Sequence, residues 1–443
     1  MIDINKLIES VRLNASESVD GKKNFAENFT QIELIDEMLE TIPAHYFEDP
    51  TMTWLDPCAG IGNFPVVLLR RLMVGLKDKI VDEQARYGHI MSNMIYMVEI
   101  QDTSAEKIID LFGTNINLHK GSFLEELGNF PDKFDFVIGN PPYEKMVSEG
   151  KRSSKNDNLW SLFIEKGMEL LKDDGHLLYI TPQAWMSPTS KILKNYFLKY
   201  NLIYLNIQDC AKYFKVGSKF SYYLLQKSTN KMKTKVLSYY PGSVNLKKTL
   251  IEAEVLIDNT VKFIPQIISP EIMSILEKTV FNGTLKKFDV NYDSDLHKFT
   301  KKTLLSDVKD DVYQHKVIHT PKQVIWSVRP HKNHGLMKVF IPLTTYYESI
   351  VIDDCGNTQG MGYIIVDDIS VAEKVKTVLL TDLYRFVANI TRWSNFNVPD
   401  VMRNLPYVDT NNYNKEEITN EEIYKLFKIT SKEIDFINSM FKR

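Results

Sequence analysis

The sequence has few cysteines and no long apolar run. Its three cysteines, Cys58, Cys210 and Cys355, lie far apart and form no Cys-x-x-Cys pair, which argues against a zinc knuckle and against a disulfide framework. No stretch approaches 18 uninterrupted apolar residues, and the first residues lack the apolar core of a signal peptide. We therefore expect a protein of the reducing cytoplasm that does not interact with membranes.

The chain also lacks a strong charge of either sign. Its 443 residues include 54 Lys and Arg against 57 Asp and Glu, and 44% hydrophobic residues give it a globular composition with room for two or three domains. The charge is uneven, because residues 312–347 contain four of the nine histidines and no acidic residue. Such a stretch suits phosphates, and an ordinary solvated face is the alternative. Its basic residues are Lys316, Lys322, Arg329, Lys332 and Lys338.

The first half of the chain alternates short apolar strands with helical patterns, which predicts a mainly parallel sheet covered on both faces. The polar run 228–235 marks a domain boundary, so we expect domains at 1–230 and 231–443. The second half lacks this alternation and reads as mixed, with a strand at 338–342 and a helix at 372–388. The expected strands of the first half are Thr51–Leu55, Ile95–Val98, Phe134–Ile138, His176–Ile180, Leu202–Ile207 and Phe220–Leu225.

A glycine-containing turn follows the first strand. It reads Asp56-Pro-Cys-Ala-Gly-Ile-Gly-Asn63, and its glycines allow the backbone to pass close to a ligand at the start of the next helix. It is neither a dinucleotide fingerprint nor a phosphate loop. Glu99 ends the next strand, where an acidic side chain suits the two hydroxyls of a ribose. The pair favours a nucleoside site over a plain solvated glutamate.

The tetrapeptide Asn140-Pro-Pro-Tyr143 is the most specific motif. Two prolines hold the backbone extended and leave carbonyl groups free to accept, Asn140 adds another acceptor, and Tyr143 offers a flat stacking surface. This set suits a planar exocyclic amine such as adenine N6. Acceptors that grip its hydrogens localise the nitrogen lone pair toward an electrophile. The alternative is a plain proline turn.

These motifs, in this order, resemble the S-adenosylmethionine-dependent DNA adenine-N6 methyltransferases of the gamma motif order. The resemblance implies a Rossmann-like α/β methyltransferase domain with a mainly parallel seven-stranded sheet, followed by a mixed α+β target recognition domain. It implies catalysis by Asn140, Pro141, Pro142 and Tyr143, with Phe214 as a second stacking aromatic and Tyr213 as its competitor. It also implies a flipped target base.

The same resemblance implies S-adenosyl-L-methionine as the cofactor. The segment Asn28-Phe-Thr30 is similar to the family segment that holds the methionine part. The third cofactor motif departs from the family, because Gly121-Ser122-Phe123 lacks the usual acidic residue, and we expect a weakened contact there. The implied cofactor-binding residues are Thr30, Asp56, Pro57, Ala59, Gly60, Gly62, Glu99, Ile100, Ser122 and Phe123.

Double-stranded DNA is the expected partner, with a cognate restriction endonuclease as a second candidate. No convincing nuclease motif is present in the chain, and the four histidines of 312–347 are not expected to bind metal. Three alternatives remain: an RNA-base or protein-glutamine methyltransferase, an inactive DNA-binding specificity protein, and the modification part of a restriction assembly. Cytosine N4 poses the same chemical problem as adenine N6. The expected DNA-binding residues are Lys316, Lys322, Arg329, Lys332, Arg392 and Arg403.

Overall fold

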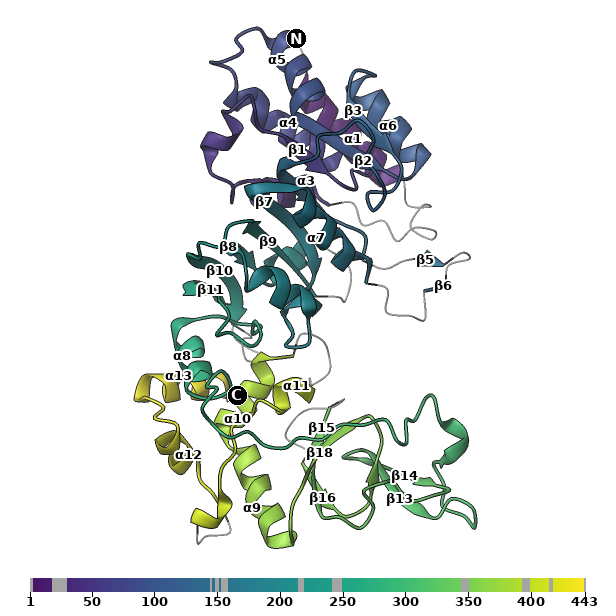
Figure 1. Ribbon diagram of the computed structural model, residues 1–443, viewed down its shortest axis with the longest axis vertical. Coiled ribbons are helices and arrows are strands. Elements are labelled where there is room, and N and C mark those ends of the chain that lie inside the picture. The colour runs from purple at the N-terminus through teal and green to yellow at the C-terminus, as the bar shows by residue number, and fades with distance from the viewer. Residues whose placement is uncertain are drawn as a thin grey trace. The chain divides into compact units, whose positions relative to one another are not determined.

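The computed structural model forms two compact units (Figure 1). The first unit comprises Met1–Trp185, Lys191–Leu237 and Glu254–Asn259, and the second comprises Met186–Ser190, Ser238–Ala253 and Thr260–Arg443. Within the described residues, no helix combines the length and the apolar character that spanning a bilayer requires. The structure describes residues 3–17, 30–143, 146–147, 151–152, 158–213, 219–240, 249–343, 350–392, 399–413 and 417–441.

A nine-stranded sheet has the order β11-β10-β8-β9-β7-β4-β1-β2-β3, and most of its strands belong to the first unit. The pairs from β7 through β4, β1 and β2 to β3 are parallel, whereas β9 runs antiparallel between β7 and β8. The strands are β1 Trp54–Asp56, β2 Ile95–Glu99, β3 Asn117–Lys120, β4 Phe134–Gly139, β7 Leu171–Pro182, β8 Asn201–Asn206, β9 Phe220–Gln226, β10 Lys233–Tyr240 and β11 Thr249–Leu256.

The predicted number of seven strands is therefore wrong, because β10 and β11 extend the sheet. β10 pairs in parallel with β8. Its exposed Lys233 and Lys235 alternate with buried Thr234 and Val236, which is the period of a strand with one covered face. The sequence reading took these lysines for part of a polar linker.

An aromatic stack fixes the register of the central strands. Trp54 on β1 is paired with Phe136 on β4, and Phe136 is paired with His176 on β7. The Trp54 and Phe136 ring centroids lie 3.9 Å apart, and those of Phe136 and His176 lie 5.0 Å apart, both nearly parallel. Burial lowers the pKa of His176 to about 4, so the ring is neutral in this stack. With these residues in register, the carboxyl ends of the strands meet at one edge.

Helices flank this sheet, with α4 and α6 beside β1 to β3 and α7 beside β7 (Figure 1). α4 is apolar on nearly all sides and buried through Leu72 and Met73, because α1 and α3 pack on it as well as the sheet. The helices are α1 Ile4–Glu17, α3 Ile32–Leu39, α4 Asn63–Gly75, α5 Glu83–His89, α6 Asp102–Phe112 and α7 Leu159–Leu170, with short turns at Ala44–Phe47, Ile90–Met94, Gln183–Met186, Leu193–Phe197 and Asp209–Tyr213.

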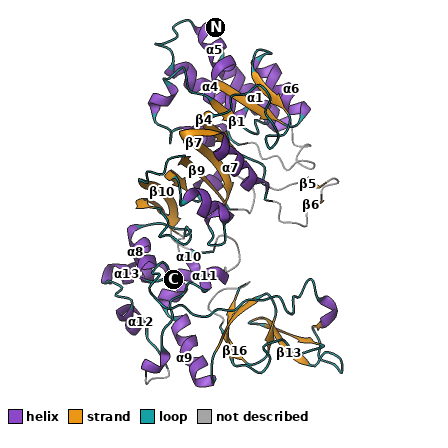
Figure 2. Cartoon of the chain, in the orientation of Figure 1, coloured by secondary structure: helices purple, strands orange, loops and turns teal. Residues whose placement is uncertain are grey.

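The second unit contains two small sheets and a group of helices, of which α9 lies beside the sheet strands β15 and β16 (Figure 2). Its sheets have the orders β12-β14-β13-β17 and β16-β15-β18. The strands are β12 Leu305–Ser306, β13 His315–Thr320, β14 Gln323–Ser327, β15 Lys338–Pro342, β16 Val351–Asp353, β17 Gly356–Asn357 and β18 Met361–Ile365. The helices are α8 Pro270–Lys278, α9 Ile369–Leu380, α10 Asp382–Ile390, α11 Pro399–Met402, α12 Asn420–Leu426 and α13 Ser431–Phe441, with short turns at Lys302–Leu304 and Thr410–Asn412.

One predicted helix of this unit is wrong in its extent. The segment 372–388 is divided between α9 and α10, because Thr381 adopts an extended conformation and precedes α10 as its N-cap. The predicted strand 338–342 is confirmed as β15. The assignment of this half as a target recognition domain stays a prediction.

Candidate active site

Two predicted motifs meet at the carboxyl edge of the sheet. β1 ends at Asp56 and its neighbour β4 ends at Gly139. A Cβ atom on Gly139 would lie 3.0 Å from Asp56 Oδ1, so this close approach requires glycine. The glycine turn and the tetrapeptide are therefore adjacent, as their placement after neighbouring parallel strands predicts.

Glu99 holds the glycine turn in place. Its carboxylate accepts hydrogen bonds from the backbone N–H of Gly60 at 2.7 Å and of Gln101 at 2.8 Å. Gly60 and Gly62 both have positive φ, +56° and +96°, which favours glycine at each position. Glu99 is buried, and a carboxylate offers about four acceptor positions. It therefore orders the turn through two backbone N–H groups.

Two buried oxygens beside this turn have no hydrogen-bond partner in the described part of the chain. They are Oδ2 of Asp56 and Oδ1 of Asn63. Burial raises the pKa of Asp56, the hydrogen bond from Cys58 N–H lowers it and the nearby Glu99 carboxylate raises it, and the result is about 8. Unsatisfied buried acceptors are costly. Both oxygens could accept hydrogen bonds from a ligand beside the turn.

Asn140 lies at the centre of a set of side-chain contacts. Its amide nitrogen donates to Thr30 Oγ1 at 3.1 Å, and its amide oxygen accepts from the Tyr143 hydroxyl at 2.7 Å. The thiol of Cys58 donates to the Asn140 carbonyl at 3.2 Å. Burial raises the pKa of Tyr143 well above its ordinary value, so its hydroxyl stays protonated. Pro141 is buried and Pro142 is exposed.

The sequence analysis did not single out Phe220. This β9 residue stacks on Tyr143 with ring centroids 4.9 Å apart. Phe214, the predicted second stacking residue, lies outside the described residues. The competing Tyr213 hydrogen-bonds through its hydroxyl to Glu37 of α3, so its polar end is engaged there. Only the antiparallel return of β9 beside β7 brings Phe220 near Tyr143, and no local sequence signal marks it.

The remaining predicted cofactor residues follow β2 and β3. Ile100 is 68% exposed next to Glu99 and offers an open apolar surface. Ser122 accepts from the backbone N–H of Leu124 at 3.2 Å, so part of its acceptor capacity closes a local turn. Phe123 is buried against Phe163 of α7, with ring centroids 5.0 Å apart. Of the two apolar side chains, Ile100 has the accessible surface.

Most of the predicted DNA-binding cations of the second unit are paired with carboxylates, several of them distant in sequence. Lys316 pairs with Asp353, Arg329 forms a bidentate pair with Asp295, and Lys332 lies 3.3 Å from an oxygen of Asp293. Arg403 pairs with Asp400, and Arg392 follows α10. Lys322 is exposed in the β13–β14 turn, and no described carboxylate pairs with it. Residues 312–347 contain no acidic residue, but Asp293, Asp295 and Asp353 pair with their cations in the folded chain.

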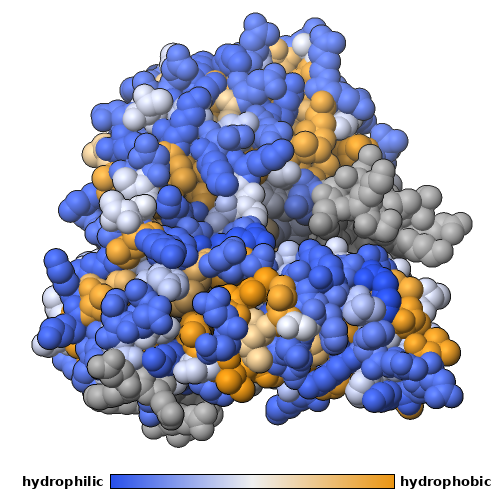
Figure 3. Space-filling model, turned by 60° about the horizontal axis from the view of Figure 1, so that its bottom comes forward, coloured by the Kyte–Doolittle hydropathy of each residue, from blue (hydrophilic) through white to orange (hydrophobic). Residues whose placement is uncertain are grey.

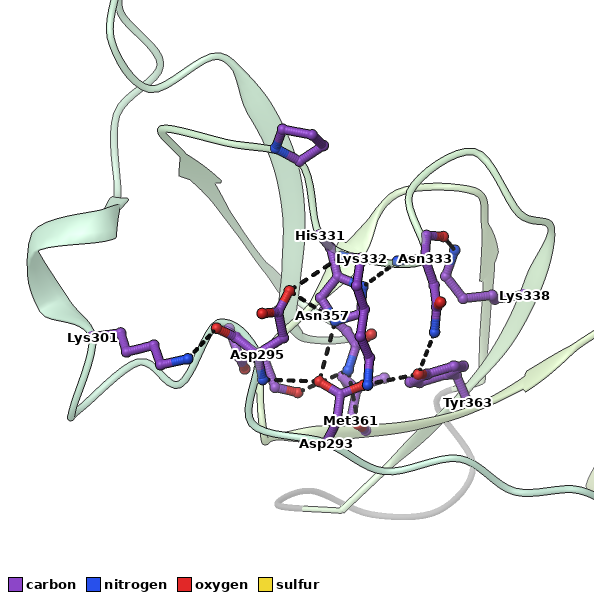
Figure 4. Close-up of polar contacts among 12 residues, drawn as sticks. Asp293, Asp295, Lys301, His331, Lys332, Asn333, Lys338, Asn357, Met361 and Tyr363 are labelled. Atoms are coloured by element: carbon purple, nitrogen blue, oxygen red, sulfur yellow. Dashed lines mark hydrogen bonds and ion pairs between the residues drawn. The ribbon is translucent and has the colours of Figure 1, made fainter.

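A polar network orders the loop that carries Arg329 and Lys332 (Figure 4). His331 donates from Nε2 to Asp293 at 3.2 Å while its Nδ1 accepts from Asn333 N–H. The Tyr363 hydroxyl donates to Asp293 at 2.8 Å and accepts from the Asn333 side chain. Lys338 is buried and its ammonium donates to three backbone carbonyls, those of Asn333, Leu336 and Asp354. The network gives the side chains of Asp293, His331, Tyr363 and Lys338 structural roles.

Figure 3 shows hydrophobic side chains in orange scattered over a mostly hydrophilic surface.

The comparisons with known proteins agree with this geometry. Residues 65–214 match the Eco57I restriction-modification methylase family. This match confirms the resemblance that the motifs indicate. The Type II methyltransferase M.VspI of Vibrio sp. (strain 343) is 24% identical over 184 residues, which cover 40% of this chain and 41% of that enzyme. An uncharacterized adenine-specific methylase of Mycoplasma pneumoniae is 23% identical over 312 residues, covering 50% of this chain and 73% of that protein.

Solved structures extend the likeness to nearly the whole chain. The Type IIL restriction-modification enzyme MmeI, solved in complex with DNA, superposes with a TM-score of 0.53 at 11% identity over 95% of this chain and 77% of that one. The chain therefore has the methyltransferase fold of restriction-modification enzymes, mixed α/β with a large mixed sheet. It spans less than half the length of the Vibrio relative.

Proposed function

We propose that this chain is a DNA methyltransferase that transfers a methyl group from S-adenosyl-L-methionine to N6 of adenine within a specific sequence. The observation that carries the proposal is the contact between Asn140-Pro-Pro-Tyr143 and the glycine turn that starts at Asp56, on a methyltransferase fold. The family match and the adenine-specific relative support the reaction class.

The residues present fit the cofactor. The methionine part of S-adenosylmethionine carries an ammonium group, and its ribose carries two hydroxyls, so it needs buried acceptors. The oxygens of Asp56 and Asn63 that lack a partner among the described residues are such acceptors, and the Glu99 carboxylate would accept from the ribose hydroxyls. Ile100 offers an apolar surface to the adenine ring. The cofactor supplies an electrophilic methyl group on a sulfonium.

The tetrapeptide residues would prepare the amine for attack. Asn140 Oδ1 and the Pro141 carbonyl would accept its two hydrogens, which localises the lone pair on nitrogen toward the methyl group. Tyr143, and Phe214 opposite it, would stack on the target ring. The nitrogen–methyl bond forms as the sulfur–methyl bond breaks, and the alkylated amine then loses a proton. The target amine lies inside a duplex, so the base must be flipped out.

The duplex contacts are assigned to the second unit. Lys322 is the predicted cation best placed to meet phosphate, since Lys316, Arg329 and Lys332 already face carboxylates. Duplex DNA is preferred over RNA or protein because the family and the relatives are those of restriction-modification methylases. A cognate restriction endonuclease is the further partner that this family suggests.

The test is to express the chain in a host without DNA methylation and to map modified bases by single-molecule sequencing. We expect N6-methyladenine at one short motif from the wild type, and none from Asn140→Ala. Asn115→Ala, which removes an exposed asparagine of the same unit, serves as the control and should keep the wild-type pattern.

Other results would contradict the proposal in different ways. N4-methylcytosine at one motif would keep the chemistry and change the target base. Unmodified DNA from a folded protein that binds S-adenosylmethionine in calorimetry would refute the DNA substrate. A folded protein that does not bind the cofactor would refute the enzyme itself.

A further inference from the structure

A chain of hydrogen bonds connects the start of α4 to the tetrapeptide. The Asn63 side chain donates from Nδ2 to the Thr30 carbonyl at 2.8 Å. The Thr30 hydroxyl in turn accepts from Asn140 Nδ2 at 3.1 Å, and the Tyr143 hydroxyl donates to Asn140 Oδ1 at 2.7 Å. Both ends of the Asn140 amide are therefore held by hydroxyl groups from different segments of the first unit.

The direction of this amide decides what Asn140 can do. Its oxygen and nitrogen are almost alike in shape but opposite in hydrogen-bonding role. An amide that turned its nitrogen toward the substrate would present hydrogens to the hydrogens of the target amine. With Nδ2 on Thr30, the oxygen is on the side of Tyr143. The oxygen has two lone pairs, so one remains for the target amine while Tyr143 occupies the other.

We propose that Asn63 and Thr30 are positioning residues that hold the Asn140 amide with its oxygen toward the target amine. This inference rests on the proposed function and goes beyond it, because it gives Thr30 a role separate from cofactor binding and adds Asn63. Both side chains belong to buried residues, with 4% of Thr30 and 8% of Asn63 exposed. Water therefore does not readily replace a lost partner, and the remaining group stays unsatisfied.

The Asn63 side chain acts on Asn140 through the main chain of Thr30. It is the first residue of α4, directly after the N-cap Gly62, and it fixes the main chain of Thr30, two residues ahead of α3. Among the described residues, Asn63 is the side chain that donates to the Thr30 carbonyl. If Asn63 is shortened, Thr30 keeps its hydroxyl but loses the contact that places it. The effects of the two residues on Asn140 should therefore depend on each other.

The position of the amide can be measured without any reaction. The full chain, deuterated and labelled with 15N-asparagine, gives side-chain amide signals, and the Asn140 signal is the one that disappears in Asn140→Asp. We expect this amide to exchange slowly with solvent in the wild type and in Thr30→Ser. In Thr30→Val, which keeps the shape and removes the acceptor, it should shift and exchange at least tenfold faster. An unchanged signal in Thr30→Val would overturn the proposal.

The consequence for the reaction is measured by single-turnover methyl transfer to unmethylated genomic DNA. Thr30→Val should lower the rate constant about tenfold, or about 1.4 kcal/mol of activation free energy, whereas Thr30→Ser should stay within twofold of the wild type. The dissociation constant of S-adenosylmethionine, from calorimetry, should change less than threefold. Thr103→Val, at an exposed threonine of α6, is the matched control.

A double-mutant cycle completes the test. At saturating S-adenosylmethionine, which removes any effect on cofactor affinity, Asn63→Ala should lower the rate constant in the wild-type background and add little in the Thr30→Val background, since the hydroxyl that it places is then absent. Equal losses of rate and of cofactor affinity in Thr30→Val would make Thr30 a cofactor contact only and refute the positioning role. If the wild type methylates no DNA, the proposed function fails, and the amide exchange data still decide where the Asn140 side chain is held.

Discussion

Asp56 provides a quantitative test of the candidate site, because it is a buried carboxyl with one partnerless oxygen among the described contacts. Its pKa rises from the ordinary 3.8 to about 8 in the folded protein. Between these values the folded state keeps a proton that the unfolded state has lost. Folding stability therefore falls as the pH rises through this window, by about 1.4 kcal/mol per pH unit. At pH 7 the cost is about 4 kcal/mol.

The substitution Asp56→Asn removes this titration and keeps the shape. The new amide also buries an unsatisfied N–H₂ group, which costs about 1–3 kcal/mol, but this cost does not depend on pH. The unfolding free energy of the variant minus that of the wild type should therefore increase by about 1.4 kcal/mol for each pH unit between roughly pH 5 and pH 7.5. The test is the slope of this free-energy difference against pH, and its absolute value at any one pH is not used.

The assay is urea unfolding at several pH values, followed by the fluorescence of buried tryptophans such as Trp54 and Trp185 of the first unit. The lowered pKa of His176 makes both proteins lose stability as the pH falls from about 6.5 toward 4, so its effect cancels in the difference. Asp110→Asn, at an exposed carboxyl of α6, is the matched control variant. A difference between Asp56→Asn and wild type that stays flat with pH would refute the reasoning.

Two further predictions concern the second unit and the glycine turn. Lys322→Ala should weaken DNA binding and reduce the slope of log affinity against log salt by about one. Lys316→Ala loses a cation already paired with Asp353, so it should change this slope less. Equal slopes for the two variants in filter-binding titrations would contradict the prediction. Gly62→Ala should lower the unfolding free energy by about 1–3 kcal/mol, because φ is +96° and the added Cβ would lie 3.1 Å from the Phe112 ring. Gly88 has open space around it, so Gly88→Ala should not lower the unfolding free energy in the same assay.

The sequence was sufficient to predict which motifs lie together. Strands that end at Asp56, Glu99 and Gly139 are neighbours in a parallel sheet, so motifs placed after them must meet at one edge. The aromatic residues that set the register were not predicted, since their stacking depends on which strands become neighbours. Phe220 was missed for the same reason, because β9 returns antiparallel from a distant part of the chain.

The extent of the sheet and the free charge of the second unit were harder to predict. The lysines of β10 were interpreted as part of a linker because the local composition is polar. The alternation of exposed Lys233 and Lys235 with buried Thr234 and Val236 indicates a strand instead. The basic stretch 312–347 was judged by its own residues, yet the carboxylates that pair with it come from 293–295 and from 353. Local charge predicts an interface only where no distant segment supplies the counter-charge.

Polar groups that hydrogen-bond to one another differ in their consequence from buried polar groups that lack a partner. In the second unit, Asp293, His331 and Tyr363 hydrogen-bond to one another, and such a network stabilises the fold without needing a ligand. Beside the glycine turn, Asp56 and Asn63 each keep a buried oxygen without a partner among the described residues, a cost that folding alone does not explain. A cationic, donor-rich ligand removes that cost, so its binding should stabilise the first unit against unfolding. The position of these two oxygens beside the glycine turn supports our proposal that the cofactor binds there.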